Sequence, residues 1–142
     1  MSDLLRQAYG VDTSKAVEGV WVTPTLLKGR DNPPQFKIAR AAKDNRKYHA
    51  AITNYATRNR RKIDLGVIDS EAQLDKALDI FVNTILLDWR NIKDPNGQDV
   101  KYTPELGKHL MIELDDLYQE LSQLAFHRDL YASEEVKDDL GK

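Results

Sequence analysis

The chain has 142 residues, about one domain, which is long enough to bury a hydrophobic core of its own. It contains no cysteine, so disulfide bonds, zinc–thiolate sites and a cysteine nucleophile are excluded. No apolar run approaches the roughly 20 residues of a membrane span. The first residues lack the basic end and apolar stretch of a signal peptide, so we expect an intracellular, soluble protein with no membrane partner.

The formal net charge of −2 hides two halves of opposite sign. Residues 1–68 carry 13 Lys and Arg against 6 Asp and Glu, or +7, and residues 69–142 carry 8 against 17, or −9. Such halves can attract one another within the fold, attract a second copy, or present a basic face to another partner. The sequence leaves these three possibilities open.

The first third of the chain predicts a β-hairpin behind a weakly patterned N-terminus. Residues 1–17 mix a few apolar side chains with polar ones, which predicts at most one short helix or a mobile arm. Residues 20–23 are β-branched and aromatic, and residues 35–39 alternate apolar with polar, so each predicts a strand. Residues 28–34 form the loop between them. Phe36 and Ile38, with Trp21 or its strand neighbours, are the candidates for the buried face.

Residues 44–62 predict an amphipathic helix. The apolar side of this helix is formed by Tyr48, Ala51, Ile52, Tyr55 and Ala56. Its far end carries cations where the negative pole of a helix favours them, namely Arg58, Arg60, Arg61 and Lys62. Residues 65–68 then form a short bridge to the next helix.

The longest apolar stripe predicts a central helix near residues 70–90. We expect this helix to begin near Ser70, which with Gln73 three residues later can cap the free amides. The stripe consists of Leu74, Ala77, Leu78, Phe81, Val82, Ile85, Leu86 and Trp89. Its central members, Leu78, Phe81, Ile85 and Leu86, are predicted to form the core.

A turn and a second helical region follow. Asp94-Pro95-Asn96-Gly97 reverses the chain and could carry a short hairpin arm through Val100 and Tyr102. Thr103 is a predicted cap with Pro104 at the first helical position. Apolar residues then recur from Leu106 to Ala125, and a break at residues 113–116 is left open. Ser133 can cap a last short helix in a C-terminal tail, residues 132–142.

The predicted fold is one α+β domain over residues 1–142, mainly α, with an N-terminal β-hairpin packed on about four helices. Catalytic motifs are missing: there is no Gly-rich phosphate loop, nucleophile elbow or histidine pair at metal spacing. We therefore expect no enzyme activity, no cofactor and no metal. His49, His109 and His127 are predicted to lie at the surface or at the core edge. Residues 94–99 only partly resemble a calcium loop, so a plain turn is expected.

Two groups of side chains are candidates for partner contacts. Arg58, Arg60 and Arg61, near Tyr48 and Tyr55, could bind phosphates and stack bases, or simply face solvent or protein. A pI of about 5.9 argues against specific nucleic-acid binding, so any binding is expected to be weak and lost steeply with salt. Trp89 is either the last core residue of its helix or an anchor in a partner's pocket.

The residues around Trp89 carry a resemblance to a known family. They are Asp88-Trp89-Arg90-Asn91-Ile92, the turn at residues 94–97, and Val100-Lys101-Tyr102-Thr103-Pro104-Glu105. This order resembles the tail assembly chaperones of long-tailed bacteriophages. Residues 36–41, followed by Asn45 and Tyr48, are similar to that family's first strand and helix, although Ala39 replaces an arginine. The similarity extends over residues 19–131.

The resemblance implies a non-enzymatic assembly factor in the host cytoplasm that is absent from the mature virion. Such chaperones bind the tape measure protein, keep it soluble, and promote polymerisation of the tail tube protein around it. The partner-binding residues would be Asp88, Trp89, Arg90 and Tyr102, with Arg58, Arg60 and Arg61. Coating by many copies implies self-association. The alternatives are a structural virion protein such as a head–tail connector component, or a small nucleic-acid-binding regulator.

The resemblance also concerns the end of the chain. Genes of this family commonly make a longer product when ribosomes slip back by one nucleotide near the end of the gene. A slippery run such as GGGAAAG reads in the normal frame as glycine then lysine, and the chain ends in Gly141-Lys142. A frameshifted long form is therefore expected if the codons have this sequence, whereas a run such as GGCAAG would remove the expectation.

Overall fold

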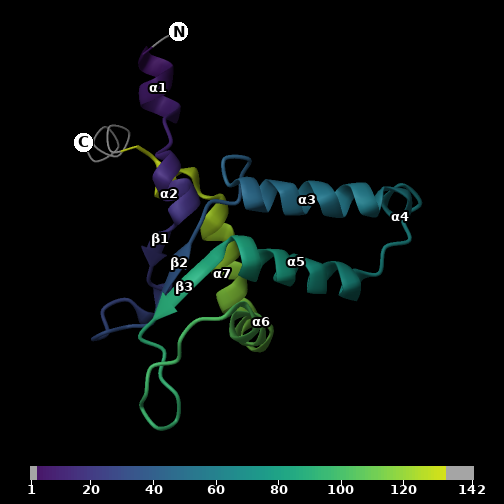
Figure 1. The fold of residues 1–142 in the computed structure, drawn as a ribbon. Coiled ribbons are helices and arrows are strands. Elements are labelled where there is room, and N and C mark those ends of the chain that lie inside the picture. The colour runs from purple at the N-terminus through teal and green to yellow at the C-terminus, as the bar shows by residue number, and fades with distance from the viewer. Residues whose placement is uncertain (1–2, 134–142) are drawn as a thin grey trace.

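The computed structural model describes residues 3–133, so the predicted helix after Ser133 and the Gly141-Lys142 end lie outside the described residues. The structure is 57% helical with a three-stranded antiparallel sheet, which confirms the predicted α+β, mainly α class (Figure 1). In chain order the elements are α1 Asp3–Tyr9, α2 Thr13–Glu18, β1 Val20–Val22, η1 Thr25–Leu27, β2 Gln35–Ile38, α3 Arg46–Arg58, α4 Arg60–Asp64, α5 Ser70–Thr84, β3 Leu86–Arg90, α6 Pro104–Glu113, α7 Asp115–Phe126 and η2 Arg128–Tyr131.

The predicted hairpin forms two strands of the sheet. β1 pairs antiparallel with β2, so that Val20 lies opposite Ile38 and Val22 opposite Phe36. Phe36 and Ile38 are buried as expected, and on β1 it is Val22 that turns into the core. Trp21 lies on the other face of the strand, because side chains alternate, and the Arg90 guanidinium lies 4.1 Å from its ring centroid.

The prediction that one helix continues to Trp89 is wrong. α5 ends at Thr84, and Leu86–Arg90 form β3, which pairs antiparallel with β2 and completes the order β1-β2-β3. The register shifts between Lys37 and Ile38, so Leu87 is an extra residue on β3. This bulge turns both Leu86 and Trp89 toward the core although they are three residues apart. The spacing that suggested a helix results from an irregular strand.

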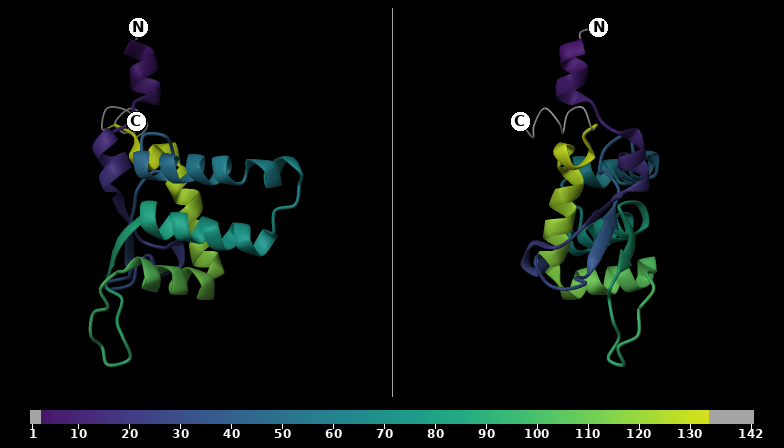
Figure 2. Two further views of the ribbon diagram at one scale, coloured as in Figure 1. Left: turned by 45° about the vertical axis from the view of Figure 1, so that its right-hand side comes forward. Right: turned by 90° about the vertical axis from the view of Figure 1, so that its left-hand side faces the viewer.

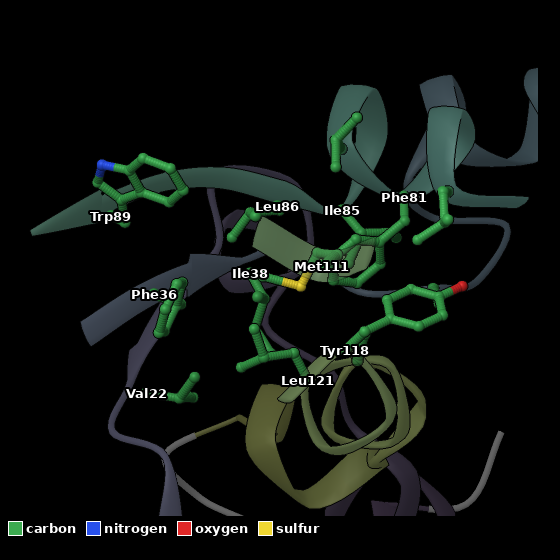
Figure 3. Close-up of a cluster of buried hydrophobic side chains, with 14 residues drawn as sticks. Val22, Phe36, Ile38, Phe81, Ile85, Leu86, Trp89, Met111, Tyr118 and Leu121 are labelled. Atoms are coloured by element: carbon green, nitrogen blue, oxygen red, sulfur yellow. The ribbon is translucent and has the colours of Figure 1, made fainter. Parts of the chain in front are cut away.

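The start of α5 and its core residues agree with the sequence. The helix begins at Ser70, although the cap is Asp69, whose carboxylate accepts from the Glu71 amide at 3.2 Å. The predicted core residues Leu78, Phe81, Ile85 and Leu86 are all buried. They meet residues of β1, β2, α6 and α7 in one cluster (Figure 3). The first turns of the helix lie outside the core, since Leu74 is 52% exposed.

The predicted helix over residues 44–62 divides at Asn59 into α3 and α4. Together with the first turns of α5, these helices form an arm, residues 46–77, that extends away from the sheet (Figure 1). No residue of α3 or α4 is buried. The apolar stripe of α3 is therefore only partly covered by the rest of the described chain.

Asn45 joins the arm to the body of the domain. Its side-chain oxygen accepts from the Tyr48 amide at 3.3 Å and caps α3. Its amide nitrogen donates to the carbonyl oxygens of Arg40 and Thr84 at 3.0 and 2.9 Å. The side chain is only 4% exposed. Asn45 thus connects the chain after β2, the start of α3 and the end of α5.

The second helical region is two helices. Thr103 caps α6 by accepting from the Leu106 amide at 3.2 Å, and Pro104 is at the start of the helix as predicted. The chain breaks at Leu114, and α7 then crosses behind the sheet (Figure 1). The turn before α6 is closed by Asp94, whose carboxylate accepts from two backbone amides at 2.9 Å. Its predicted hairpin arm is reduced to a single bridge between Lys93 and Asp99.

Two short helices stand at the N-terminus, where at most one was predicted. α2 is held against the body, because Ala16 is fully buried and its carbonyl oxygen accepts from the Arg40 amide at 2.9 Å. α1 lies apart from the sheet in every view (Figure 2). Its Leu4 and Leu5 are exposed, so this helix has an uncovered apolar side.

Candidate partner-binding surfaces

Trp89 lies inside the fold. It is 6% exposed, and its ring packs edge-on against Phe36 and Tyr102 at centroid distances of 6.4 and 5.0 Å. The indole nitrogen donates to the Val100 carbonyl oxygen at 2.7 Å, which holds the loop over residues 91–103 against the sheet. The sequence left open whether Trp89 is a core residue or an anchor in a partner's pocket. The structure shows it in the core, and a contact with a partner stays a prediction.

Tyr102 ties the same loop to the junction of α5 and β3. Its hydroxyl lies 2.6 and 3.0 Å from the carbonyl oxygens of Val82 and Leu86, where it donates. Burial and the charge of Asp88 raise the pKa of Tyr102, so the hydroxyl keeps its proton. A methyl group on Gly107 would come within 2.6 Å of the Tyr102 ring, so this glycine makes room for it.

The remaining predicted residues near Trp89 are at the surface. Asp88 and Arg90 are exposed, and the Arg90 Nε atom donates to the Gln35 side chain at 2.6 Å. Asp88, Trp89, Arg90 and Tyr102 do line one depression of about 280 Å³. The structure thus brings these four together, with the two aromatic rings committed to internal packing.

Arg58, Arg60 and Arg61 are not part of that group. They lie at the far end of the arm, on the last turn of α3 and on α4, whereas β3 is in the sheet (Figure 1). All three side chains are exposed. The predicted binding residues therefore form two separate surfaces, and the role of each stays a prediction.

The ion pairs between described residues do not join the two oppositely charged halves. Between residues that the structure describes, no ion pair joins residues 1–68 to residues 69–133. The pairs are Arg40 with Asp44, Lys93 with Asp99, Lys108 with Asp75 and Asp79, and Arg128 with Asp129. Each of these pairs therefore lies within one half of the chain, and the three possibilities that the sequence left open stay predictions.

Sequence reasoning missed an apolar groove between α3, α5 and α7. It has a volume of about 170 Å³. Its floor includes Phe81, packed edge-on against Tyr118 at 5.0 Å (Figure 3), and its rim includes Ile52 and Phe126, which are 41% and 61% exposed. The other residues along it are Ala41, Tyr48, Ala77, Ile80, Ile85, Ser122 and Ala125. The three helical stripes were visible in the sequence, but which of their residues stay uncovered depends on how the helices meet.

The three histidines are spread over the surface. His49 on α3, His109 on α6 and His127 between α7 and η2 are all exposed. Among residues 3–133 there is no group of three His, Cys, Asp or Glu side chains arranged to hold a metal ion. In that same range, none of the helices combines the length and the apolar character that a bilayer crossing requires. What the surface does offer is uncovered apolar area.

A family model described as YdaY prophage protein matches residues 42–142, which include the arm, α5, β3, α6 and α7. No curated protein and no solved structure matches the chain.

Proposed function

We propose that this chain, which belongs to the YdaY prophage protein family and is thus phage-derived, acts as a tail assembly chaperone. It binds helical segments of the tape measure protein in the host cytoplasm, keeps them soluble, and promotes polymerisation of the tail tube protein around them. It leaves before the virion is complete.

The observation that supports this proposal is the open groove between α3, α5 and α7. An amphipathic helix binds a partner by placing apolar side chains at positions i, i+3, i+4 and i+7 into a groove of this kind. Here Ile52 on α3 and Phe126 at the end of α7 present apolar surface on the two sides, and the partly exposed Tyr48 and the buried Ile80 line the groove between them. A tape measure protein, a long helical chain with exposed apolar stripes, has the matching chemistry.

The amount of other uncovered apolar surface supports the same function. Leu4, Leu65 and Val67 are between 64% and 71% exposed. Extensive apolar exposure marks sites of protein contact, and a coat protein touches both its cargo and its neighbours. At the end of the arm, aliphatic side chains lie beside the exposed arginines. This composition favours a protein over nucleic acid as the partner.

Coexpression with the tape measure protein of the same prophage tests the groove. Phe126→Glu places a charge at the rim, and because Phe126 is already 61% exposed the fold is expected to persist. We expect the soluble fraction of the tape measure protein to fall to the level seen without the chaperone. Leu26→Glu is the matched control, since Leu26 is 89% exposed but does not line the groove, and it should keep wild-type solubility.

Two outcomes would contradict the proposal. One is a tape measure protein that is equally soluble with and without the wild-type chain. The other is a Phe126→Glu variant that is folded by circular dichroism and still solubilises it fully. Recovery of the chain from purified virions by mass spectrometry would favour the alternative of a structural head–tail component.

A further inference from the structure

The three walls of the groove between α3, α5 and α7 differ in chemistry. The wall formed by α5 contributes only apolar side chains, namely Ala77, Ile80 and Phe81. The other two walls carry hydroxyl groups, from Tyr48 on α3 and from Tyr118 and Ser122 on α7. Tyr118 and Ser122 are four residues apart, so they lie on the same face of their helix, one turn from each other. We call the hydroxyls of these three residues the groove hydroxyls.

The groove hydroxyls are not used by the fold. Among residues 3–133, no hydrogen bond involves the side-chain oxygen of Tyr48, Tyr118 or Ser122. Tyr102 and Tyr131, in contrast, donate to backbone carbonyl oxygens inside the domain. Figure 3 shows the Tyr118 hydroxyl at the edge of the core cluster, pointing away from it. Because polar groups that lose water are normally hydrogen-bonded, the groove hydroxyls need a partner once something covers the groove.

The state of these hydroxyls determines which chemical groups fit. Burial raises the pKa of Tyr48 and of Tyr118, and the charge of Asp115 and the nearby Tyr48 raise that of Tyr118 further. Both phenols therefore keep their protons and can donate as well as accept. Among the described residues, no charged side chain lines the groove. A carboxylate or an ammonium group placed there would lose water without meeting an opposite charge.

We propose that the groove selects helical segments that place an amide side chain, Gln or Asn, between apolar neighbours. The amide oxygen accepts from the groove hydroxyls and the amide nitrogen donates to them, while the neighbours pack on the α5 wall. A leucine in the same place would displace water and leave the groove hydroxyls without partners, which weakens binding. The inference rests on the proposed function, because it takes a helical segment as the occupant.

The size of the groove agrees with an occupant of this kind. An apolar cavity of about 150 Å³ holds a benzene-sized molecule. At about 170 Å³ the groove therefore has room for one or two side chains of a partner. Binding sites that are mostly apolar use a few polar groups to fix the orientation and identity of what they bind. The groove hydroxyls are placed to have that role here.

Three synthetic peptides test the selection with the purified chain. They are amphipathic helices of about 20 residues, long enough to form a helix alone. They differ only at one position in the middle of the apolar face, which is Gln, Leu or Glu. Fluorescence anisotropy gives the dissociation constants. We expect the Gln peptide to bind at least about tenfold more tightly than either of the others.

Removing the hydroxyls from the chain identifies the groups that carry the preference. The triple variant Tyr48→Phe, Tyr118→Phe and Ser122→Ala keeps both aromatic rings. It should bind the Leu peptide at least as tightly as the Gln peptide, whereas a merely structural effect would weaken both peptides equally. Tyr55→Phe is the matched control, since Tyr55 is on α3 but does not line this groove, and it should keep the wild-type preference.

The proposal is overturned if the wild-type chain binds the Gln and Leu peptides equally or binds neither. It is also overturned if the triple variant, shown to be folded by circular dichroism, keeps the wild-type preference. The two proposals fail separately. A chain that solubilises the tape measure protein without an amide preference keeps the chaperone function and loses this inference, and a chain with the preference but without solubilisation does the reverse.

Discussion

Phe81→Ala is expected to lower the free energy of unfolding by about 3–5 kcal/mol. Phe81 is 5% exposed and packs edge-on against Tyr118 at 5.0 Å, at 87° between the ring planes. Removing the ring leaves a space that opens toward the groove between α3, α5 and α7. Asn45 ties the start of α3 to the end of α5 beside the sheet, so the helices can close that space only in part.

Urea unfolding of both proteins measures this difference. The control is Leu74→Ala on the same helix, where 52% exposure should limit the loss to under about 1 kcal/mol. If the Phe81→Ala variant also lost under about 1 kcal/mol, Phe81 would not belong to the core.

Asn45→Asp, which replaces only the side-chain NH2 group by an oxygen, is expected to lower the free energy of unfolding by about 3 kcal/mol or more near neutral pH. The new carboxylate can still accept from the Tyr48 amide. It cannot donate to the carbonyl oxygens of Arg40 and Thr84, which lie 3.0 and 2.9 Å from the nitrogen it replaces. Three oxygens then face one another in a site that is 4% exposed, and one carries a charge.

The loss should depend on pH in a direction that the contacts determine. A protonated carboxyl group can donate to one carbonyl, so the folded state raises the pKa of the new group above its unfolded value. The stability of the variant should therefore be highest in acid, below the unfolded pKa, and fall as pH rises through the folded pKa. Asn54→Asp, the same change at an exposed position of α3, should show neither the loss nor the trend. Equal pH profiles for the two variants would contradict this account of Asn45.

The features predicted correctly from the sequence are those fixed by neighbouring residues. The Thr103 cap, the Asp94 turn and the β1–β2 hairpin each depend on a few adjacent side chains and on alternation, so the pattern was enough. The core positions on α5 were also predicted, because Leu78 and Phe81 fall on the same side of any helix there.

The features that were missed depend on distant parts of the chain. β3 looked helical because the bulge at Leu87 puts Leu86 and Trp89 on one face at a spacing of three. Tyr131 is fully buried, and its hydroxyl donates to the Ile38 carbonyl oxygen at 3.2 Å, yet it stands outside any periodic stripe. Predicting the groove would have required knowing which apolar residues on three helices remain uncovered. No local pattern contains that information.

Hydrogen exchange of the chain with and without a helical fragment of its tape measure protein tests the groove most directly. Exchange reports protection of backbone amides where a partner covers or rigidifies them. The chaperone account predicts slower exchange in α3 around Ile52, in α5 around Ile80 and at the end of α7 around Phe126. The loop over residues 91–103 should be unchanged. Binding that protects the loop and leaves these three helices unprotected would contradict it.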